Sequence, residues 1–261
     1  MHGATRPNLH LYNPSIQPYR PEGTGHNTVR WIAAVRHTNH HNCNSSRTPV
    51  PADLEEQTAI VLMDESFAVT QSVIKNFGVI GAKDKYNSQF TQDCRIFDLG
   101  SSAKSRLWLS CFRQKHTYMS ELRVHLGQDG TISVGSFSFI GPVGVDFRAR
   151  GTRSPVDKNL QYFLHQGSVW LQFRINPHSV CRLDMKTGRC ANTASMYETK
   201  IDVPNNVWNH DVLRGNACCL HVESSNIFLG VGHFKSGGYQ HMFFAFEASP
   251  PFKIVWVGEP W

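Results

Sequence analysis

The sequence predicts an all-β protein that folds as a five-bladed β-propeller. Short β-branched and aromatic runs, bounded by turn-forming residues, recur almost to the C-terminus, and few windows carry the period of an amphipathic helix. Units that carry hairpins begin roughly every fifty residues, near Asn13, Asp93, Asp157, Arg214 and Tyr239. This spacing favours a propeller over a sandwich, and about five such units fit 261 residues as a single domain, 1–261.

Strands and hairpins follow one another in order. RLWLSCF (106–112) is a strand, and ELRVHL and TISVGSFSF pair across GQDG, whose glycines supply unusual backbone angles. SVWLQFRI is followed by the turn NPH and the strand SVCRLDM. ACCLHVE and IFLGVGHF pair across SSN, and QHMFFAFE and FKIVWVG pair across ASPP.

A polar loop insertion is predicted at 37–57, which has two prolines and few large apolar residues. Its histidines are expected to be solvated, because no acidic or cysteine partner stands at a metal-ligand spacing. The seven cysteines contain no C-x-x-C pair, which argues against zinc. Cys111 and Cys181 lie in strand-like runs and are expected to be buried thiols that pack as small hydrophobes. No metal and no cofactor is expected.

The charge pattern argues against two classes of partner. Net charge is +6, yet the 26 basic residues are scattered and form no run of the kind that binds nucleic acid. No apolar run approaches the ~20 residues that a membrane span needs. We therefore expect no nucleic-acid partner and no membrane span.

Polar residues gather where these strands begin or end. In a propeller, loops at one end of the innermost strands converge on a central pocket, so such residues are candidates to face it. The candidates are Asn13, Asp93, Arg95, Asp157, Lys158, Asn159, His178, Arg214, Asn216 and His233.

These motifs together resemble the five-bladed β-propeller superfamily of carbohydrate-active enzymes that includes arabinanases, fructosidases and β-mannoside phosphorylases. QDCRIF stands where a divergent, little-characterised branch has an acidic residue followed by Asp-Pro-Arg, and DKNLQYF, NPH and KTG are similar to that branch's next blade. The resemblance covers roughly 11–257. It departs from the pattern at Cys94, which replaces Pro, at Asp157, which replaces Glu, and at Leu160, which replaces a stacking aromatic residue.

The resemblance implies a protein that acts on a glycosidic bond in the central pocket, as a glycoside hydrolase, glycoside phosphorylase or glycosyltransferase-like protein. Asp93 and Asp157 would be the catalytic carboxyl pair, one protonating the glycosidic oxygen while the other stays ionised. Lys158, Asn159 and His178 would bind phosphate, by analogy with the phosphorylases. The expected ligands are an oligosaccharide or glycoside, with inorganic phosphate or a sugar phosphate as the second reactant.

Two other functions stay open. One is a non-catalytic glycan-binding propeller, in which Asn13, Asp93, Arg95 and Asn216 hold sugar hydroxyls. The other is a protein-interaction propeller, although the Trp-Asp and Gly-His signature of the commonest interaction type is missing. Structural roles are also open for single residues: Asp157 as a turn cap, Lys158 as a solvated side chain and His178 as a donor to a carbonyl.

Overall fold

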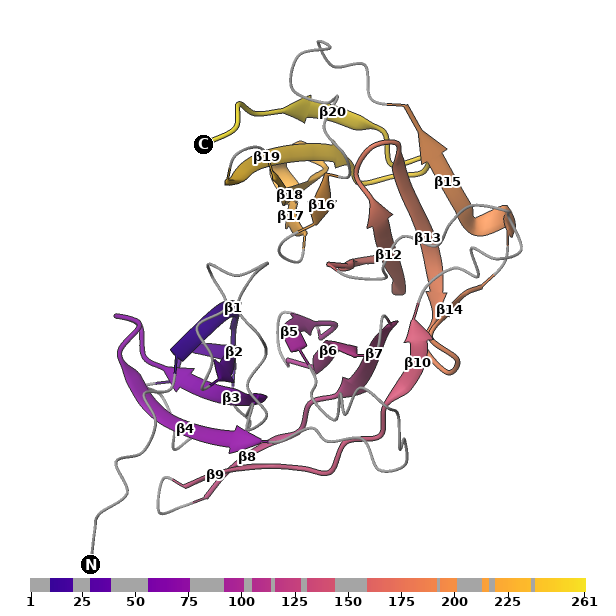
Figure 1. Ribbon diagram of the computed structural model, residues 1–261. Helices are drawn as coiled ribbons and strands as arrows, with labels where there is room; N and C mark the ends of the chain where they lie inside the picture. The colour runs from indigo at the N-terminus through magenta and orange to yellow at the C-terminus, as the bar shows by residue number, and fades with distance from the viewer. Residues whose placement is uncertain are drawn as a thin grey trace, which may run out of the picture. The chain divides into compact units, whose positions relative to one another are not determined.

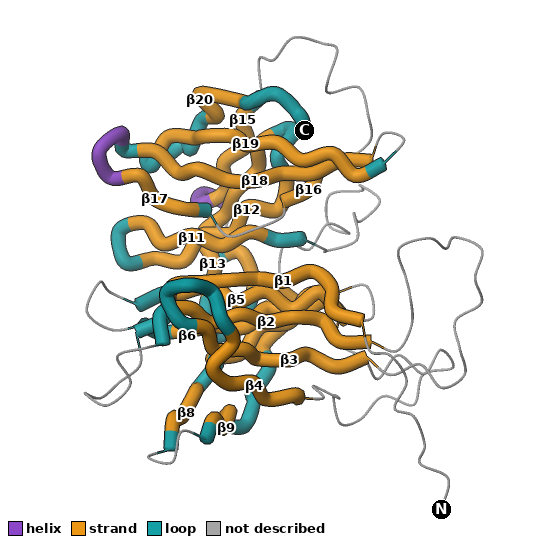
Figure 2. The backbone as a smooth tube through the Cα atoms, turned by 90° about the vertical axis from the view of Figure 1, so that its left-hand side faces the viewer, coloured by secondary structure: helices purple, strands orange, loops and turns teal. Residues whose placement is uncertain are grey.

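Antiparallel strands form nearly all of the regular structure (Figure 1, Figure 2). The computed structural model describes residues 10–20, 29–38, 56–75, 92–100, 105–113, 116–127, 131–143, 159–191, 193–200, 213–215, 219–235 and 238–261. The helices within these ranges are two short 3₁₀ turns, η3 (Thr193–Ser195) and η4 (Glu223–Ser225). Among the described helices, none has the length and apolar character to cross a membrane. The all-β prediction is confirmed.

The first sheet is a four-stranded meander in which each strand pairs with the next. Its strands are β1 (His10–Pro18), β2 (Trp31–Thr38), β3 (Glu56–Met63) and β4 (Val69–Lys75). β2 and β3 pair without interruption, from Trp31 opposite Met63 to Thr38 opposite Glu56. The two ends of the predicted loop at 37–57 therefore extend these strands, and 39–55 lies outside the described residues.

The second sheet has the order β10-β7-β6-β5. Its strands are β5 (Gln92–Asp98), β6 (Leu107–Arg113), β7 (His116–Glu121) and β10 (Ile140–Val143). A separate hairpin joins β8 (Val124–Leu126) to β9 (Ile132–Val134), which confirms the pairing predicted across GQDG.

The third sheet is the meander β11-β12-β13-β14, with β15 paired to β13. Its strands are β11 (Gln161–His165), β12 (Ser168–Arg174), β13 (His178–Asp184), β14 (Arg189–Cys190) and β15 (Met196–Thr199). The turn between β12 and β13 contains a cis peptide bond before Pro177. The predicted strand, NPH turn and strand are therefore present in this sheet.

The fourth sheet has the order β16-β18-β19-β20, with β17 paired to β18. Its strands are β16 (Arg214–Gly215), β17 (Leu220–Val222), β18 (Ile227–Lys235), β19 (Tyr239–Glu247) and β20 (Ile254–Val257). Both hairpins predicted for this part of the chain are confirmed, and β18 also pairs with β19 along its whole length.

The number of blades predicted from the sequence is wrong. The units expected near Arg214 and near Tyr239 belong to one sheet, because β18 carries hydrogen bonds to strands of both. The described residues form four blade-like antiparallel sheets in a β-propeller arrangement, rather than five. The spacing of hairpins along the sequence does not distinguish two hairpins of one sheet from two separate blades.

The chain divides into two compact units, which are described separately. Unit 1 contains Met1–Gln114 and Ser120–Ser138, and unit 2 contains Lys115–Met119 and Phe139–Trp261. The boundary falls within β7, so unit 1 holds the first sheet, β5, β6 and the β8–β9 hairpin, while unit 2 holds β10 and the third and fourth sheets. The single domain at 1–261 stays a prediction.

Unit 2 has an aromatic core between its third and fourth sheets. The ring of Phe163 on β11 lies 4.6 Å from that of Phe228, 5.3 Å from that of Phe246 and 5.4 Å from that of Phe252, measured between centroids. All four side chains are at most 3% exposed. Burial of a Phe side chain contributes roughly 1.5–3 kcal/mol, so this cluster is a main source of stability for the unit.

Two disulfides lie within single sheets. Cys94 on β5 is bonded to Cys111 on β6, and Cys181 on β13 is bonded to Cys190 on β14. The prediction that Cys111 and Cys181 are thiols is therefore wrong, although both are fully buried as expected. Strand pairing brings each partner close, which spacing along the chain does not reveal.

Candidate functional site

Asp93 occupies an unusual backbone position at the start of β5. Its φ is +48°, in the left-handed region that few non-glycine residues adopt. The pairing of β5 with β6 shifts register between Gln92 and Arg95, so Asp93 lies in a local irregularity of the strand. Irregular backbone of this kind often re-aims a side chain near a functional site.

The carboxylate of Asp93 is buried beside a guanidinium group. Arg36 Nη1, from β2, lies 3.7 Å from Asp93 Oδ1, and the two side chains are 9% and 5% exposed. A buried charge requires a partner of opposite sign, because transfer from water is costly. The positive charge of Arg36 therefore stabilises the ionised form of the Asp93 carboxylate.

β1 is fixed next to this pair by a hydroxyl group. Ile96 N on β5 donates to Ser15 Oγ on β1 at 3.0 Å, and Ser15 Oγ lies 3.4 Å from Ile96 O. β1 itself shifts register between Tyr12 and Ser15, so Asn13 lies within that irregularity. The Asn13 side chain is outside the described part, but its backbone is in the strand next to β5.

The disulfide that follows Asp93 supports the strand. Cys94 is cross-linked to β6, and Thr58 Oγ1 lies 3.4 Å from Cys94 Sγ. In the resemblance expected from the sequence, Cys94 stands where the Asp-Pro-Arg signature has proline. Arg95 comes next and is half-buried. The first departure from the signature therefore has a structural role, because the cross-link restrains the backbone that carries Asp93.

Of the candidates before β11, only Asn159 is described. It is half-buried and has a φ of +65°, a conformation that asparagine adopts more readily than most residues. Asp157 and Lys158 lie outside the described residues, so the carboxyl pair of Asp93 and Asp157 stays a prediction. Leu160, where the resemblance has an aromatic residue, is 5% exposed.

His178 is a buried residue of unit 2. Its Nδ1 lies 2.7 Å from the carbonyl oxygen of Phe252, and its ring is 4.9 Å from that of Phe246. Burial lowers the pKa of His178 from 6.5 to about 4, although the hydrogen bond to Phe252 opposes this shift. The ring is therefore neutral near pH 7 and donates Nδ1–H to the carbonyl, as in the structural alternative. A neutral, buried ring offers no positive charge to an anionic ligand.

The fourth sheet brings two candidates together. Arg214 on β16 and His233 on β18 are directly opposite each other in the ladder. Arg214 is exposed, while the half-buried His233 ring lies 5.7 Å from Tyr239 and 6.0 Å from His241. Asn216 lies outside the described residues. These two residues are a neighbouring pair in unit 2, whereas Asp93 and Arg95 belong to unit 1.

Arg36 is the functional candidate that sequence reasoning missed. The candidates predicted from the sequence lie at the starts and ends of strands, whereas Arg36 lies inside the strand WIAAVRHT. A charged residue next to five apolar ones is itself informative, because charges are almost never fully buried unless paired. No group of three or more His, Cys, Asp or Glu suited to a metal occurs among the described residues.

Comparison with known proteins adds no relative: no family model matches this chain, and no curated protein matches it.

Proposed function

We propose that this protein is a carbohydrate-active propeller protein that acts on a glycosidic bond, as a glycoside hydrolase, phosphorylase or glycosyltransferase-like protein. The observation that carries the proposal is the buried Arg36–Asp93 pair, placed on an irregular, left-handed backbone at the start of β5. Buried charge on sparsely populated backbone is costly and is concentrated at functional sites. The position is also that of the aspartate in the signature that the sequence resembles.

The ion pair favours one of the two catalytic roles for Asp93. Cleavage of a glycosidic bond needs a protonated carboxyl group as acid and a second, ionised carboxylate as base or nucleophile. Arg36 stabilises the charged form of Asp93, which suits the ionised role. Asp157 is then the proposed acid, and Lys158 and Asn159 remain proposed ligands of the anionic reactant.

A non-catalytic glycan-binding protein is the second candidate. The observation in its favour is a departure from the resembled enzymes at Leu160, which stands where they have a stacking aromatic residue and is 5% exposed. A buried aliphatic side chain offers no ring face to hold a substrate sugar in position for catalysis, so sugar binding would depend on polar groups. An ionised aspartate paired with arginine still provides acceptors and donors for sugar hydroxyls.

Turnover assays on the full chain would separate these candidates. Release of reducing sugar from a panel of aryl glycosides and oligosaccharides is measured with and without inorganic phosphate. If the protein is an enzyme, the parent turns over at least one substrate and Asp93→Asn does not. The substitution keeps the shape of the side chain, so sugar affinity should change little. Saturable glycan binding with no turnover would favour the binding protein. The absence of both turnover and glycan binding would reject both candidates.

The ion pair makes a folding control necessary. Asp93→Asn removes the negative charge of the buried pair and keeps the positive charge of Arg36, so this variant is compared with Arg36→Gln/Asp93→Asn, in which neither side chain is charged. If turnover is lost in both variants while the double variant melts like the parent, the loss is chemical. Recovery of turnover in the double variant would remove Asp93 from the catalytic role.

A further inference from the structure

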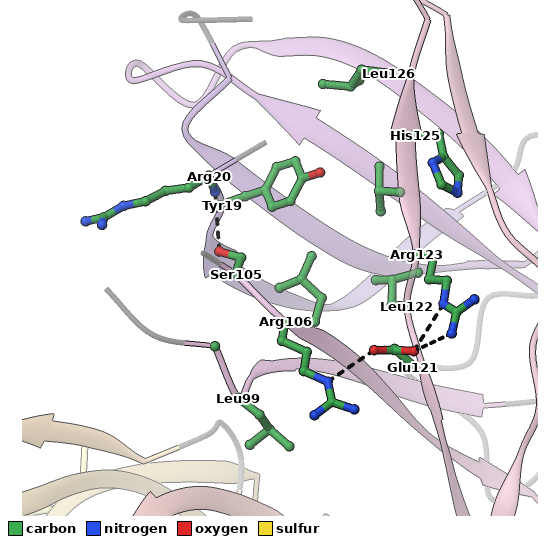
Figure 3. A pocket seen from close by; sticks show the side chains of 13 residues that line it. Tyr19, Arg20, Leu99, Ser105, Arg106, Glu121, Leu122, Arg123, His125 and Leu126 are labelled. Carbon is green, nitrogen blue, oxygen red and sulfur yellow. Dashed lines mark hydrogen bonds and ion pairs between the residues drawn. The ribbon is translucent and has the colours of Figure 1, made fainter. Parts of the chain in front are cut away.

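A second concave site lies in unit 1, near the end of β5 that is remote from Asp93. The pocket has a volume of about 720 Å³ and borders Leu99, the residue after β5. Asp93 and Asp98 are five positions apart, which in a strand corresponds to about 17 Å. Figure 3 shows side chains from β7, β8 and the residues beside β1 and β6 around this pocket. The site is therefore distinct from the Arg36–Asp93 pair.

The pocket is positively charged. Its lining residues include Arg20, Arg106 and Arg123 and a single acidic residue, Glu121, although the Arg20 side chain extends away from the other two arginines (Figure 3). The guanidinium groups of Arg106 and Arg123 together outweigh the one carboxylate of Glu121 and leave a net positive charge. His125 also lines the pocket. A concave surface with one dominant sign of charge attracts ligands of the opposite sign.

Glu121 orients two of these arginines. Arg106 Nε donates to Glu121 Oε1 at 3.1 Å, while Arg123 donates to Oε2 through Nε at 3.1 Å and Nη2 at 2.9 Å (Figure 3). The hydrogen bond from Arg123 and then that from Arg106 lower the pKa of Glu121, against the effect of burial. The carboxylate thus stays ionised at neutral pH and orients both guanidinium groups, whose side chains are 61% and 69% exposed.

Several donors of the two arginines are left over. Among the described residues, neither terminal nitrogen of Arg106 nor Nη1 of Arg123 makes a hydrogen bond. The Arg106 guanidinium also lies over the Trp108 ring, 5.7 Å from its centroid, which restricts its position further. Guanidinium groups held in place in this way bind oxyanions well, because their N–H groups match the spacing of two oxygens.

Part of the rest of the lining is apolar. Leu99, Val124 and Leu126 line the pocket and are half-buried, so they keep some surface in contact with water, whereas Leu107 and Leu122 are at most 4% exposed. Inorganic phosphate would leave this surface in contact with water. A ligand that carries an organic group next to its oxyanion would cover it and gain hydrophobic free energy.

We propose that this pocket binds a small organic phosphate or sulfate monoester, whose oxyanion accepts hydrogen bonds from Arg106 and Arg123 and whose organic group packs on the leucines. The pocket differs in residues and position from the site proposed to act on glycosidic bonds, so each can fail without the other. Phosphate and sulfate monoesters share the tetrahedral oxyanion, and the experiment distinguishes them.

Isothermal titration of the full chain with phenyl phosphate, phenyl sulfate and inorganic phosphate tests the proposal at low ionic strength. We expect saturable binding of at least one ester, at least tenfold tighter than inorganic phosphate. Arg106→Gln and Arg123→Gln should each weaken that binding about tenfold or more, the usual effect of losing a hydrogen bond to a charged group. Added salt should weaken binding in the parent.

Arg189→Gln is the matched control, because Arg189 is an exposed arginine on β14 of unit 2. This variant should bind the ester like the parent. Circular dichroism checks that each variant keeps the parent's fold. Absence of ester binding at millimolar concentration would overturn the proposal, as would folded Arg106 and Arg123 variants that bind like the parent. Inorganic phosphate binding as tightly as the esters would overturn the role of the leucines.

Discussion

Arg36 on β2 and Asp93 on β5 form a buried ion pair between the first and second sheets within unit 1, with Nη1 3.7 Å from Oδ1. The strands of the pair belong to different sheets, so the contact is made by side chains. This pair links the backbone irregularity at Asp93 to the regular ladder of β2 and β3. Its energetic coupling can be measured.

A double-mutant cycle should give strong coupling between these residues. Asp93→Asn or Arg36→Gln alone removes one charge of the buried pair, and breaking a buried pair in this way typically costs about 3–5 kcal/mol in the free energy of unfolding. The double variant should be more stable than the sum of the two single effects predicts. Urea denaturation followed by circular dichroism measures all four proteins, and additive losses would contradict the coupling.

Both disulfides should be detectable by peptide mapping under non-reducing conditions. Trypsin would leave 86–95 joined to 107–113 through Cys94 and Cys111, and 175–182 joined to 190–200 through Cys181 and Cys190. Closure of such short loops stabilises the fold by about 3 kcal/mol in the chain-entropy description. Reduction should therefore lower the urea midpoint, and these four peptides appearing unlinked before reduction would contradict both bonds.

His178 should make the fold sensitive to acid. Its folded-state pKa is about 4, below the 6.5 of the exposed group, so the unfolded chain takes up the proton first as the pH falls. Stability from the neutral ring is complete above pH 6.5 and is lost progressively toward pH 4, by on the order of 3 kcal/mol. His178→Gln, which cannot take up a proton in this range, should reduce the loss of stability between pH 7 and pH 4. Equal losses in the two proteins would contradict this role.

Gly230 is expected to resist substitution. It lies opposite Phe244 in the β18–β19 ladder, and a Cβ at Gly230 would overlap the Phe244 ring, which is fully buried. Gly230→Ala should therefore destabilise the protein by roughly 1–3 kcal/mol, as overpacking usually does. Gly238→Ala is the control, since no atom lies within 4 Å of the Cβ position there. Similar melting temperatures for the two variants would argue against the overlap.

Strands and hairpins could be predicted from the sequence because their causes are local. Alternating apolar runs and turn residues located β12, β13 and β17 to β20 with small errors at their ends. The number of sheets could not be counted in this way. Whether β18 pairs only with β17 or also with β19 depends on backbone hydrogen bonds that leave no separate mark in the residue pattern.

Part of the candidate site could also be predicted. The place of Asp93 at the start of a strand makes it a candidate, and the structure shows that it is buried and has a left-handed backbone conformation. Its partner Arg36 is 57 residues away in a different sheet, so only the folded chain reveals the contact. The disulfides escaped prediction for the same reason, since each depends on which strands become neighbours.

The left-handed backbone at Asp93 narrows the choice of residue there before any chemistry is considered. Glycine, asparagine and aspartate tolerate that conformation, whereas β-branched residues are strongly disfavoured. A library with all twenty residues at position 93 can be sorted first for correct folding and then for activity. The first sort should therefore return few residue types, and the second should return aspartate alone.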